Sequence, residues 1–133
     1  MRWRSPLVPF LLIVVASGCA SSRRVVVRET PPPHVSEVTC EGLASYYARS
    51  LHGNPTASGE IYDENALTAA HRTWEFGTSV RVTNLSNGRT VVVRINDRGP
   101  YIEARVIDLS YRAAQEIGLI ETGIERVRLE TID

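Results

Sequence analysis

The spacing of apolar residues predicts that the second half of the chain is built from short β-strands. Along residues 78–85, Val80 and Val82 alternate with polar side chains, which is the period of two that a half-buried strand shows. Residues 90–96 follow with a nearly continuous apolar run, typical of a strand inside a sheet. Between them, Asn87-Gly88 favours a type I′ turn, because both residue types tolerate a positive φ. The two strands are therefore predicted to form a hairpin.

The remaining pattern predicts three more strands and one helix. The strand-like segments are residues 42–48, 106–109 and 126–132. Ser110 is a good N-cap, and the apolar face from Tyr111 to Ile117, followed by Gly118, predicts a short helix with a defined end. Five or six strands, one helix and long loops in about 95 residues predict a mostly β fold, a small closed barrel.

The first residues have the pattern of an export signal rather than of a folded element. Arg2 and Arg4 precede an apolar run over residues 7–16, about half of the roughly 20 residues that a membrane-spanning helix needs. Small residues then lead into Cys19. This segment resembles the lipobox of bacterial lipoproteins, in which the Cys carries lipid and becomes the mature N-terminus, although Ala16 stands where Leu is usual. An ordinary secretory signal with an incidental Cys is the alternative.

The chain is therefore expected to contain a lipoprotein signal peptide (1–18), a tether (19–39) and one barrel domain (40–133). The run Pro31-Pro32-Pro33 favours an extended, semi-rigid spacer. With Cys19 lipidated, Cys40 has no partner for a disulfide and is expected to be a small buried hydrophobe. No Asp follows Cys19, which by resemblance favours the periplasmic face of the outer membrane.

Charge and composition narrow the choice of partners. All 15 basic residues are Arg, and removing the two in the signal leaves 15 − 2 = 13 against 15 acidic residues. No cationic run is longer than a pair, so nucleic acid is a poor candidate and a membrane is expected to be reached only through Cys19. A neutral or zwitterionic polymer such as a glycan fits better. The three His residues lack metal-ligand spacing, so neither a metal nor a cofactor is expected.

Three polar clusters interrupt the barrel pattern, at residues 52–60, 69–71 and 96–101. Asp97 lies where the most apolar strand ends and a Gly-Pro turn begins, so a rigid element is expected to hold its carboxylate. Taken alone, each candidate has an ordinary structural explanation. Asp97 would be a turn residue, His71 a core residue and Glu60 a solvated loop charge.

A series of short motifs changes this interpretation. In chain order they are Gly42-Leu-Ala-Ser-Tyr-Tyr, His52-Gly53, Thr56-Ala57-Ser58-Gly59-Glu60, Leu67-Thr68-Ala69-Ala70-His71, Val80-Arg-Val-Thr-Asn-Leu, Asn87-Gly88-Arg89, Val93-Arg94-Ile95-Asn96-Asp97-Arg98-Gly99-Pro100 and Ile107-Asp108-Leu109-Ser110. The series strongly resembles the rare lipoprotein A family and covers nearly all of residues 41–133. The resemblance implies a double-psi β-barrel, shared in outline with expansins and barwin-like proteins, and lytic transglycosylase activity on peptidoglycan.

The chain departs from the family pattern at a few positions, where the family often has Trp, Gly, Phe and Leu-Pro: Tyr46, Ala48, Leu51 and Trp74-Glu75. These positions are expected to affect glycan preference more than fold. Many members also carry a glycan-binding repeat domain after the barrel, and none is expected here because the chain stops at Asp133.

By resemblance, the catalytic positions fall on Asp97, with His71 and Glu60 as partners. A lytic transglycosylase closes the sugar's own 6-hydroxyl onto C1, so one acid can protonate the leaving oxygen and then accept the hydroxyl proton. Asp97 would have to start protonated, which burial or a negative neighbour such as Glu60 would favour, while His71 would orient the acid or the sugar. The positive charge of Arg98 opposes the protonated form of Asp97 unless its guanidinium points elsewhere. Asp108 is a second candidate carboxylate, with a structural hydrogen bond or a capping role as the alternative.

The resemblance also suggests how substrate is held. Tyr46, Tyr47 and Tyr101 are expected to stack on sugar rings, with Arg98 binding substrate beside them. The expected partners are peptidoglycan glycan strands, the membrane through Cys19, and proteins of the division complex. Two other functions stay open, a glycan-binding module without turnover and a structural lipoprotein that links membrane and wall. The joint presence of three polar catalytic candidates favours the enzyme.

Overall fold

The computed structural model describes residues 37–132. The predicted signal peptide, the lipidation site Cys19 and the tether up to residue 36 lie outside the described residues, so these expectations stay predictions. Within the described part of the chain, no helix combines the length and the apolar character needed to cross a membrane.

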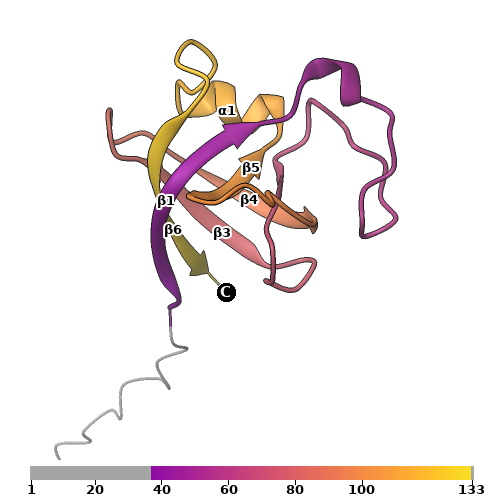
Figure 1. Ribbon diagram of the computed structural model, residues 1–133, viewed down its shortest axis with the longest axis horizontal. Coiled ribbons are helices and arrows are strands. Elements are labelled where there is room, and N and C mark those ends of the chain that lie inside the picture. Colours follow the sequence, from indigo (N-terminus) through magenta and orange to yellow (C-terminus); the bar gives the residue numbers. More distant parts are fainter. Residues whose placement is uncertain (1–36, 133) are drawn as a thin grey trace, which may run out of the picture. The chain divides into compact units, whose positions relative to one another are not determined.

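Within residues 37–132, six strands close into a barrel, which confirms the mostly β fold with one short helix. The elements are β1 (Thr39–Tyr46), the 3₁₀ turn η1 (Arg49–Leu51), β2 (Thr68–Ala70), β3 (Ser79–Asn84), β4 (Thr90–Asp97), β5 (Arg105–Leu109), α1 (Tyr111–Glu116) and β6 (Glu125–Ile132). Around the barrel the strands follow the order β1-β5-β2-β4-β3-β6. Figure 1 shows β1 and β6 side by side in this closed sheet. The pairs β1/β5 and β2/β4 are parallel, and the other neighbours are antiparallel.

The barrel interior is filled from alternate positions of the strands and from α1, which contacts β1, β4 and β5. The largest fully buried side chains are Ile95, Ile107, Leu109, Ile117, Leu119 and Leu129. Each side chain of this kind contributes about 1.5–3 kcal/mol through burial. The Ser110 hydroxyl accepts a hydrogen bond from the Ala113 N–H at 3.2 Å, and Gly118 has φ 72° after the helix. Both predicted ends of the helix are thereby confirmed.

The first strand begins earlier than the sequence pattern predicts. β1 starts at Thr39 rather than at residue 42, because the segment from Thr39 to Ala44 pairs antiparallel with β6. The predicted tether therefore overlaps the barrel by one residue. Cys40 packs against the core and carries a free thiol, but it is half-buried rather than buried as the sequence predicts.

The turn between β3 and β4 differs from the predicted type I′ turn. Gly88 has φ 74°, but among residues 37–132 the only non-glycine residue with positive φ is Ala104, so Asn87 does not occupy the left-handed region. The loop instead widens so that the Gly88 N–H donates to the Asn84 carbonyl at 2.8 Å. The physical reason lies outside the hairpin, since the side-chain amides of Asn84 and Asn87 both donate to the Ile117 carbonyl at the end of α1.

Candidate active site

Two carboxylates lie at one end of the barrel, on the two strands that flank β2. Ala70, the last residue of β2, pairs with Asp97 on β4 and with Asp108 on β5. Directly paired residues face the same side of a sheet, so the two carboxylates flank the small Ala70 side chain. With strands about 4.8 Å apart, the Cα atoms of the two Asp residues are roughly 10 Å from each other. Because β2 has only three residues, the sequence pattern does not predict it, yet it sets this spacing.

A cavity of about 450 Å³ opens above these carboxylates. The loop between β1 and β2 lies beside this end of the barrel (Figure 1). The cavity lining includes six polar residues that matter below, Tyr46, Tyr47, Asp97, Arg98, Arg105 and Asp108. The structure thus brings Asp97 together with three of the predicted substrate-binding residues, whereas His71, Glu60 and Tyr101 are not among the residues that line the cavity.

The two oxygens of the Asp97 carboxyl have different partners. Oδ1 accepts hydrogen bonds from two backbone groups, the Ala57 N–H at 2.8 Å and the Arg98 N–H at 2.9 Å. Oδ2 accepts a hydrogen bond from the Tyr47 hydroxyl. A backbone N–H can only donate, whereas a hydroxyl can donate or accept. A proton on Asp97 therefore belongs on Oδ2, beside Tyr47, and both residues line the cavity.

Tyr47 is held as a hydrogen-bond donor to this acid. Burial, followed by the hydrogen bond to Asp97, raises the pKa of Tyr47 far above its ordinary value, so the phenol keeps its proton. Its ring packs against Tyr62 with centroids 4.6 Å apart, and the Tyr62 hydroxyl in turn accepts a hydrogen bond from the Tyr111 N–H. The expected sugar-stacking residue is therefore also the direct partner of Asp97, a contact that the sequence pattern did not suggest.

His71 lies beside Asp97 through its backbone. The His71 N–H donates to the Asp97 carbonyl at 3.1 Å, while the imidazole Nδ1 accepts hydrogen bonds from the backbone of Thr73 and Trp74. The ring stacks on Trp74, with centroids 3.9 Å apart and planes within 6°. Burial, followed by the charges of Arg98 and Arg72, lowers the pKa of His71. A neutral ring with Nδ1 occupied carries its proton on Nε2.

Glu60 reaches a different partner from the one expected. Its carboxylate accepts two hydrogen bonds from Arg94, at 2.7 and 2.9 Å, and one from the Asn96 amide at 2.9 Å. The Arg94 hydrogen bond is the largest cause of a lowered pKa of Glu60. Its charge is thus matched by Arg94, and no hydrogen bond to Asp97 is found in residues 37–132. Glu60 belongs to the same loop as Ala57, whose N–H holds Asp97, and its carboxylate fastens that loop to Arg94 and Asn96 of β4.

Arg98 points away from the carboxylate that precedes it. Its guanidinium donates to the carbonyls of His71 at 3.2 Å and Trp74 at 2.8 Å, and it covers the Phe76 ring at 4.0 Å. The sequence left open whether this charge opposes a protonated Asp97. The structure directs the side chain into the loop that carries His71.

Asp108 forms an ion pair across the cavity wall rather than a helix cap. Its Oδ1 accepts a hydrogen bond from Arg105 Nη2 at 2.5 Å, and both side chains line the cavity. Ser110 caps α1 instead. Sequence reasoning singled out Asp108 only as a second carboxylate and missed Arg105. Their pairing becomes apparent only in the structure, where the two side chains meet at the cavity wall.

The other two aromatic candidates lie in different settings. Tyr46 lines the cavity, and its hydroxyl donates to the Ile120 carbonyl at 3.2 Å. Tyr101 is 78% exposed on the loop between β4 and β5. Within residues 37–132, no three His, Cys, Asp or Glu side chains are grouped in a way that would hold a metal ion.

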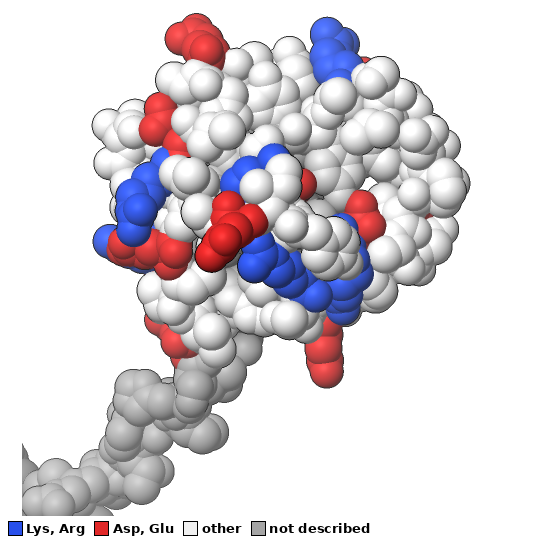
Figure 2. Space-filling view, viewed as in Figure 1, with Lys and Arg blue, Asp and Glu red and all other residues white. Residues whose placement is uncertain are grey.

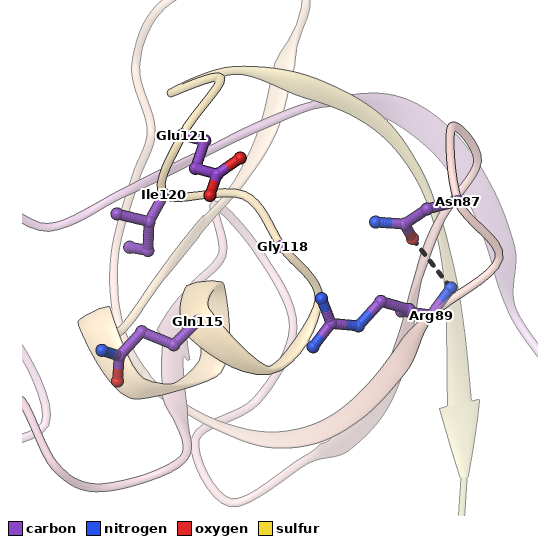
Figure 3. Close-up of a pocket in the computed structure, with 6 residues that line it drawn as sticks. All are labelled: Asn87, Arg89, Gln115, Gly118, Ile120 and Glu121. Atoms are coloured by element: carbon purple, nitrogen blue, oxygen red, sulfur yellow. Dashed lines mark hydrogen bonds between the residues drawn. The ribbon is translucent and has the colours of Figure 1, made fainter.

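A second cavity, of about 380 Å³, lies between the β3–β4 turn and the segment after α1. Figure 3 shows Arg89 extending from that turn toward Gly118, with Glu121 as the acidic side chain in the lining. It has no pair of carboxylates, so the first cavity is the better candidate for catalysis. On the face in Figure 2, Arg and acidic side chains are intermixed rather than gathered into one field, which suits a ligand without strong net charge.

Comparison with known proteins places this barrel among characterised sequences. The lytic transglycolase family matches residues 39–129. The "Probable endolytic peptidoglycan transglycosylase RlpA" of Treponema pallidum is 58% identical over 93 residues, which are 70% of this chain and 29% of that protein. The "Endolytic peptidoglycan transglycosylase RlpA" of Neisseria meningitidis is 49% identical over 117 residues, which are 88% of this chain and 49% of that protein. The chain thus spans less than half the length of each of these relatives.

Two solved structures share the fold. The Streptomyces papain inhibitor has a TM-score of 0.59 at 24% identity, covering 72% of this chain and 96% of that one. An apo expansin of Clavibacter michiganensis has a TM-score of 0.57 at 26% identity, covering 72% of this chain and 51% of that one. Together with the family match, these likenesses identify the barrel as the double-psi type.

Proposed function

The chain belongs to the rare lipoprotein A family of lytic transglycolases, and from this we propose that its barrel cleaves the MurNAc–GlcNAc bond of peptidoglycan strands and leaves 1,6-anhydro-MurNAc ends. The observation that carries the proposal is the asymmetric setting of Asp97. One carboxyl oxygen is held by two backbone donors, and the other accepts a hydrogen bond from the Tyr47 hydroxyl, a residue that lines the cavity together with Asp97.

In the proposed reaction Asp97 acts first as an acid and then as a base. Its Oδ2 proton passes to the glycosidic oxygen as the bond from that oxygen to C1 breaks. The 6-hydroxyl oxygen of the same MurNAc then bonds to C1, and its proton returns to Oδ2. No water is activated, so the second carboxylate that most glycosidases use is not required.

The neighbours of Asp97 support each half of this cycle. The Tyr47 hydroxyl can accept a hydrogen bond from the protonated acid and donate one to the carboxylate that forms when the proton leaves. The two N–H groups on Oδ1 keep the carboxyl plane fixed, which keeps Oδ2 beside the Tyr47 hydroxyl. Catalysis gains from such groups when they are in place before the reaction begins.

The other candidates take supporting roles in the proposal. His71 stays neutral and orients the acid, since its N–H donates to the Asp97 carbonyl, and Glu60 orders the loop that supplies the Ala57 N–H. Tyr46 and Tyr47 contact sugar rings within the cavity. Arg98 contributes by holding the loop of His71 rather than by contacting the acid.

The proposal extends to where the barrel works. Cys19 carries the lipid anchor, and the tether over residues 19–39 lets the barrel reach the wall from the periplasmic face of the outer membrane. Several acyl chains at Cys19 would hold the protein stably, whereas a single chain binds membranes only marginally. Proteins of the division complex are the further partners we propose for a wall enzyme anchored in this way.

The function is tested by incubating the protein with purified sacculi and measuring anhydro-muropeptides by mass spectrometry. We expect release by the wild type and a loss of about 10²–10⁴-fold in Asp97→Asn, because the amide can neither give nor take the proton. Asp63→Asn, at an exposed carboxylate outside the cavity lining, is the matched control and should retain full activity. Equal release by Asp97→Asn would move the acid to Asp108 or Glu60. Strand binding without release by any variant would make the barrel a glycan-binding module.

A further inference from the structure

The loop between β4 and β5 exposes two large apolar side chains beside the cavity. Tyr101 is 78% exposed and Ile102 is 57% exposed. The loop connects Arg98 to Arg105, and both of these residues line the cavity. Its tip therefore stands at the cavity rim, in continuity with the proposed catalytic site.

This loop is fastened by one side chain from a different part of the chain. Arg72, just after β2, donates from Nε to the Pro100 carbonyl at 2.5 Å. Its Nη2 donates to the Ile102 carbonyl at 2.6 Å and to the Arg105 carbonyl at 2.9 Å. Three carbonyls spread along the loop are thus bound by a single guanidinium.

Backbone contacts complete the fastening. The Arg105 N–H donates to the Ile102 carbonyl at 3.2 Å, and the Leu43 N–H of β1 donates to the Ala104 carbonyl at 3.0 Å. Ala104 has φ 69°, a conformation that L side chains rarely adopt and that persists only when its surroundings hold it. The exposed side chains are thus carried by an ordered loop. Binding a ligand therefore does not require the free energy that ordering a loop usually takes.

The chemistry of the exposed pair suits a sugar ring. A pyranose presents a face of C–H groups and a rim of hydroxyls, and Tyr offers an apolar ring with a polar end. Glu103 is the only charged side chain between Gly99 and Ala104. An uncharged saccharide therefore fits this surface better than an ionic ligand.

We propose that residues 99–104 form a sugar-binding subsite outside the cavity, where Tyr101 stacks on a ring of the glycan strand beyond the cleaved bond and Arg72 is the positioning residue. The subsite rests on the glycan-cleaving function proposed above. It holds long strands and leaves the chemical step unchanged. Only Arg can fill the positioning role fully, because Lys presents a single point of donation where the loop needs a fork.

The test measures binding of GlcNAc oligomers to the protein in an Asp97→Asn background, by isothermal titration. Tyr101→Ala is expected to weaken binding of the hexasaccharide about tenfold and to leave binding of the disaccharide, which is short enough to lie within the cavity, unchanged. Arg72→Lys should also weaken binding of the hexasaccharide. The double variant should bind no more weakly than Tyr101→Ala alone, because Arg72 acts through Tyr101. Arg112→Lys, on the exposed face of α1, is the control and should bind both oligomers normally.

The outcomes separate the subsite from the proposed reaction. Equal hexasaccharide binding by the wild-type background and Tyr101→Ala would overturn the subsite, and so would additive losses in the double variant. If Arg72→Lys melts early, Tyr101→Ala, at an exposed side chain, still decides the question. Release of anhydro-muropeptides from sacculi by the protein with Asp97 intact reports on the reaction alone. In that assay Tyr101→Ala should raise KM for long strands and leave kcat unchanged. Self-association that disappears in Tyr101→Ala while hexasaccharide binding persists would assign the loop to a second copy of the chain and overturn the proposal.

Discussion

At the residue scale, Asp97 differs from an ordinary surface carboxylate in what its two oxygens touch. The backbone donors on Oδ1 come from residues 57 and 98, and the hydroxyl on Oδ2 comes from residue 47. Two chain segments far from Asp97 in the sequence, at residues 47 and 57, therefore meet at its side chain. A turn-forming Asp needs only local partners, so this convergence favours the proposed acid over the structural interpretation.

Removing the Tyr47 hydroxyl tests this arrangement. Tyr47→Phe keeps the ring that packs on Tyr62 but removes the donor that stabilises the Asp97 carboxylate once the proton has left. A hydrogen bond to a charged group contributes about 1.5–3 kcal/mol, so we expect the rate to fall roughly tenfold to a hundredfold. The measurement is the initial rate of anhydro-muropeptide release. Tyr111→Phe, which loses a hydroxyl outside the cavity lining, should be unaffected. An unchanged rate in Tyr47→Phe would exclude a role of the Tyr47 hydroxyl in stabilising the Asp97 carboxylate.

The lowered pKa of His71 predicts a pH dependence of stability. Burial, Arg98 and Arg72 lower this pKa below its ordinary value of 6.5, so between the two values the unfolded chain binds more protons than the folded one. The stability that the neutral His71 contributes is therefore fully present above about pH 6.5, and it is lost as the pH falls through the folded pKa of His71. Glu60 acts in a separate window, because its pKa is lowered from 4.5.

Thermal melts between pH 5 and pH 7 isolate the His71 contribution, since Glu60 is ionised throughout that range. The wild type should lose melting temperature as the pH falls, and His71→Gln should show a flatter slope. Parallel slopes for wild type and His71→Gln would contradict the assignment.

At the element scale, β4 carries the proposed acid and divides its apolar residues between two faces. Val93 is 1% exposed and Val92 is 43% exposed, although the sequence presents them as one continuous run. The strand lies between β2 and β3, so its backbone is paired on both sides. The end of β4 is consequently rigid, and this holds the backbone of Asp97 in place.

The two adjacent valines provide a matched test of the buried strand. Val93→Asp places an unpaired charge in the barrel interior and should destabilise the protein by several kcal/mol, about 3–5. Val92→Asp makes the same chemical change on the outer face and should cost no more than about 0.5–1 kcal/mol. Urea denaturation followed by circular dichroism measures both. Equal losses for the two variants would show that the alternation along β4 is misassigned.

At the scale of the whole molecule, the proposed anchor and the barrel are separate parts with separate tests. The short apolar run and small residues before Cys19 predict that it is lipidated and forms the mature N-terminus. Cys19→Ser should then release a soluble or unprocessed form, detected by membrane fractionation and immunoblotting. Cys40→Ser, on β1, should remain in the membrane fraction. An unchanged distribution of Cys19→Ser would remove the anchor from the proposal.

The sequence by itself determined the parts of this protein that depend on neighbours in the chain. The period of two located β3 and β6, short apolar runs located β4 and β5, and the cap at Ser110 with the end at Gly118 located α1, because side-chain pattern and capping are local. The ordered motifs led to the family and to Asp97 as the candidate acid, since a strand end followed by Gly-Pro is visible without a structure.

The tertiary structure decided the contacts that join distant segments. β2 is too short to show a period, and it forms because β4 and β5 supply its hydrogen bonds. The hydroxyl that meets Asp97 comes from 50 residues away, and the carbonyls that draw Arg98 aside lie 24 and 27 residues before it. The wide β3–β4 turn likewise depends on a carbonyl at the end of α1. Partners so far apart in sequence are brought together only by closing the barrel, because local pattern carries no information about which side chains meet across it.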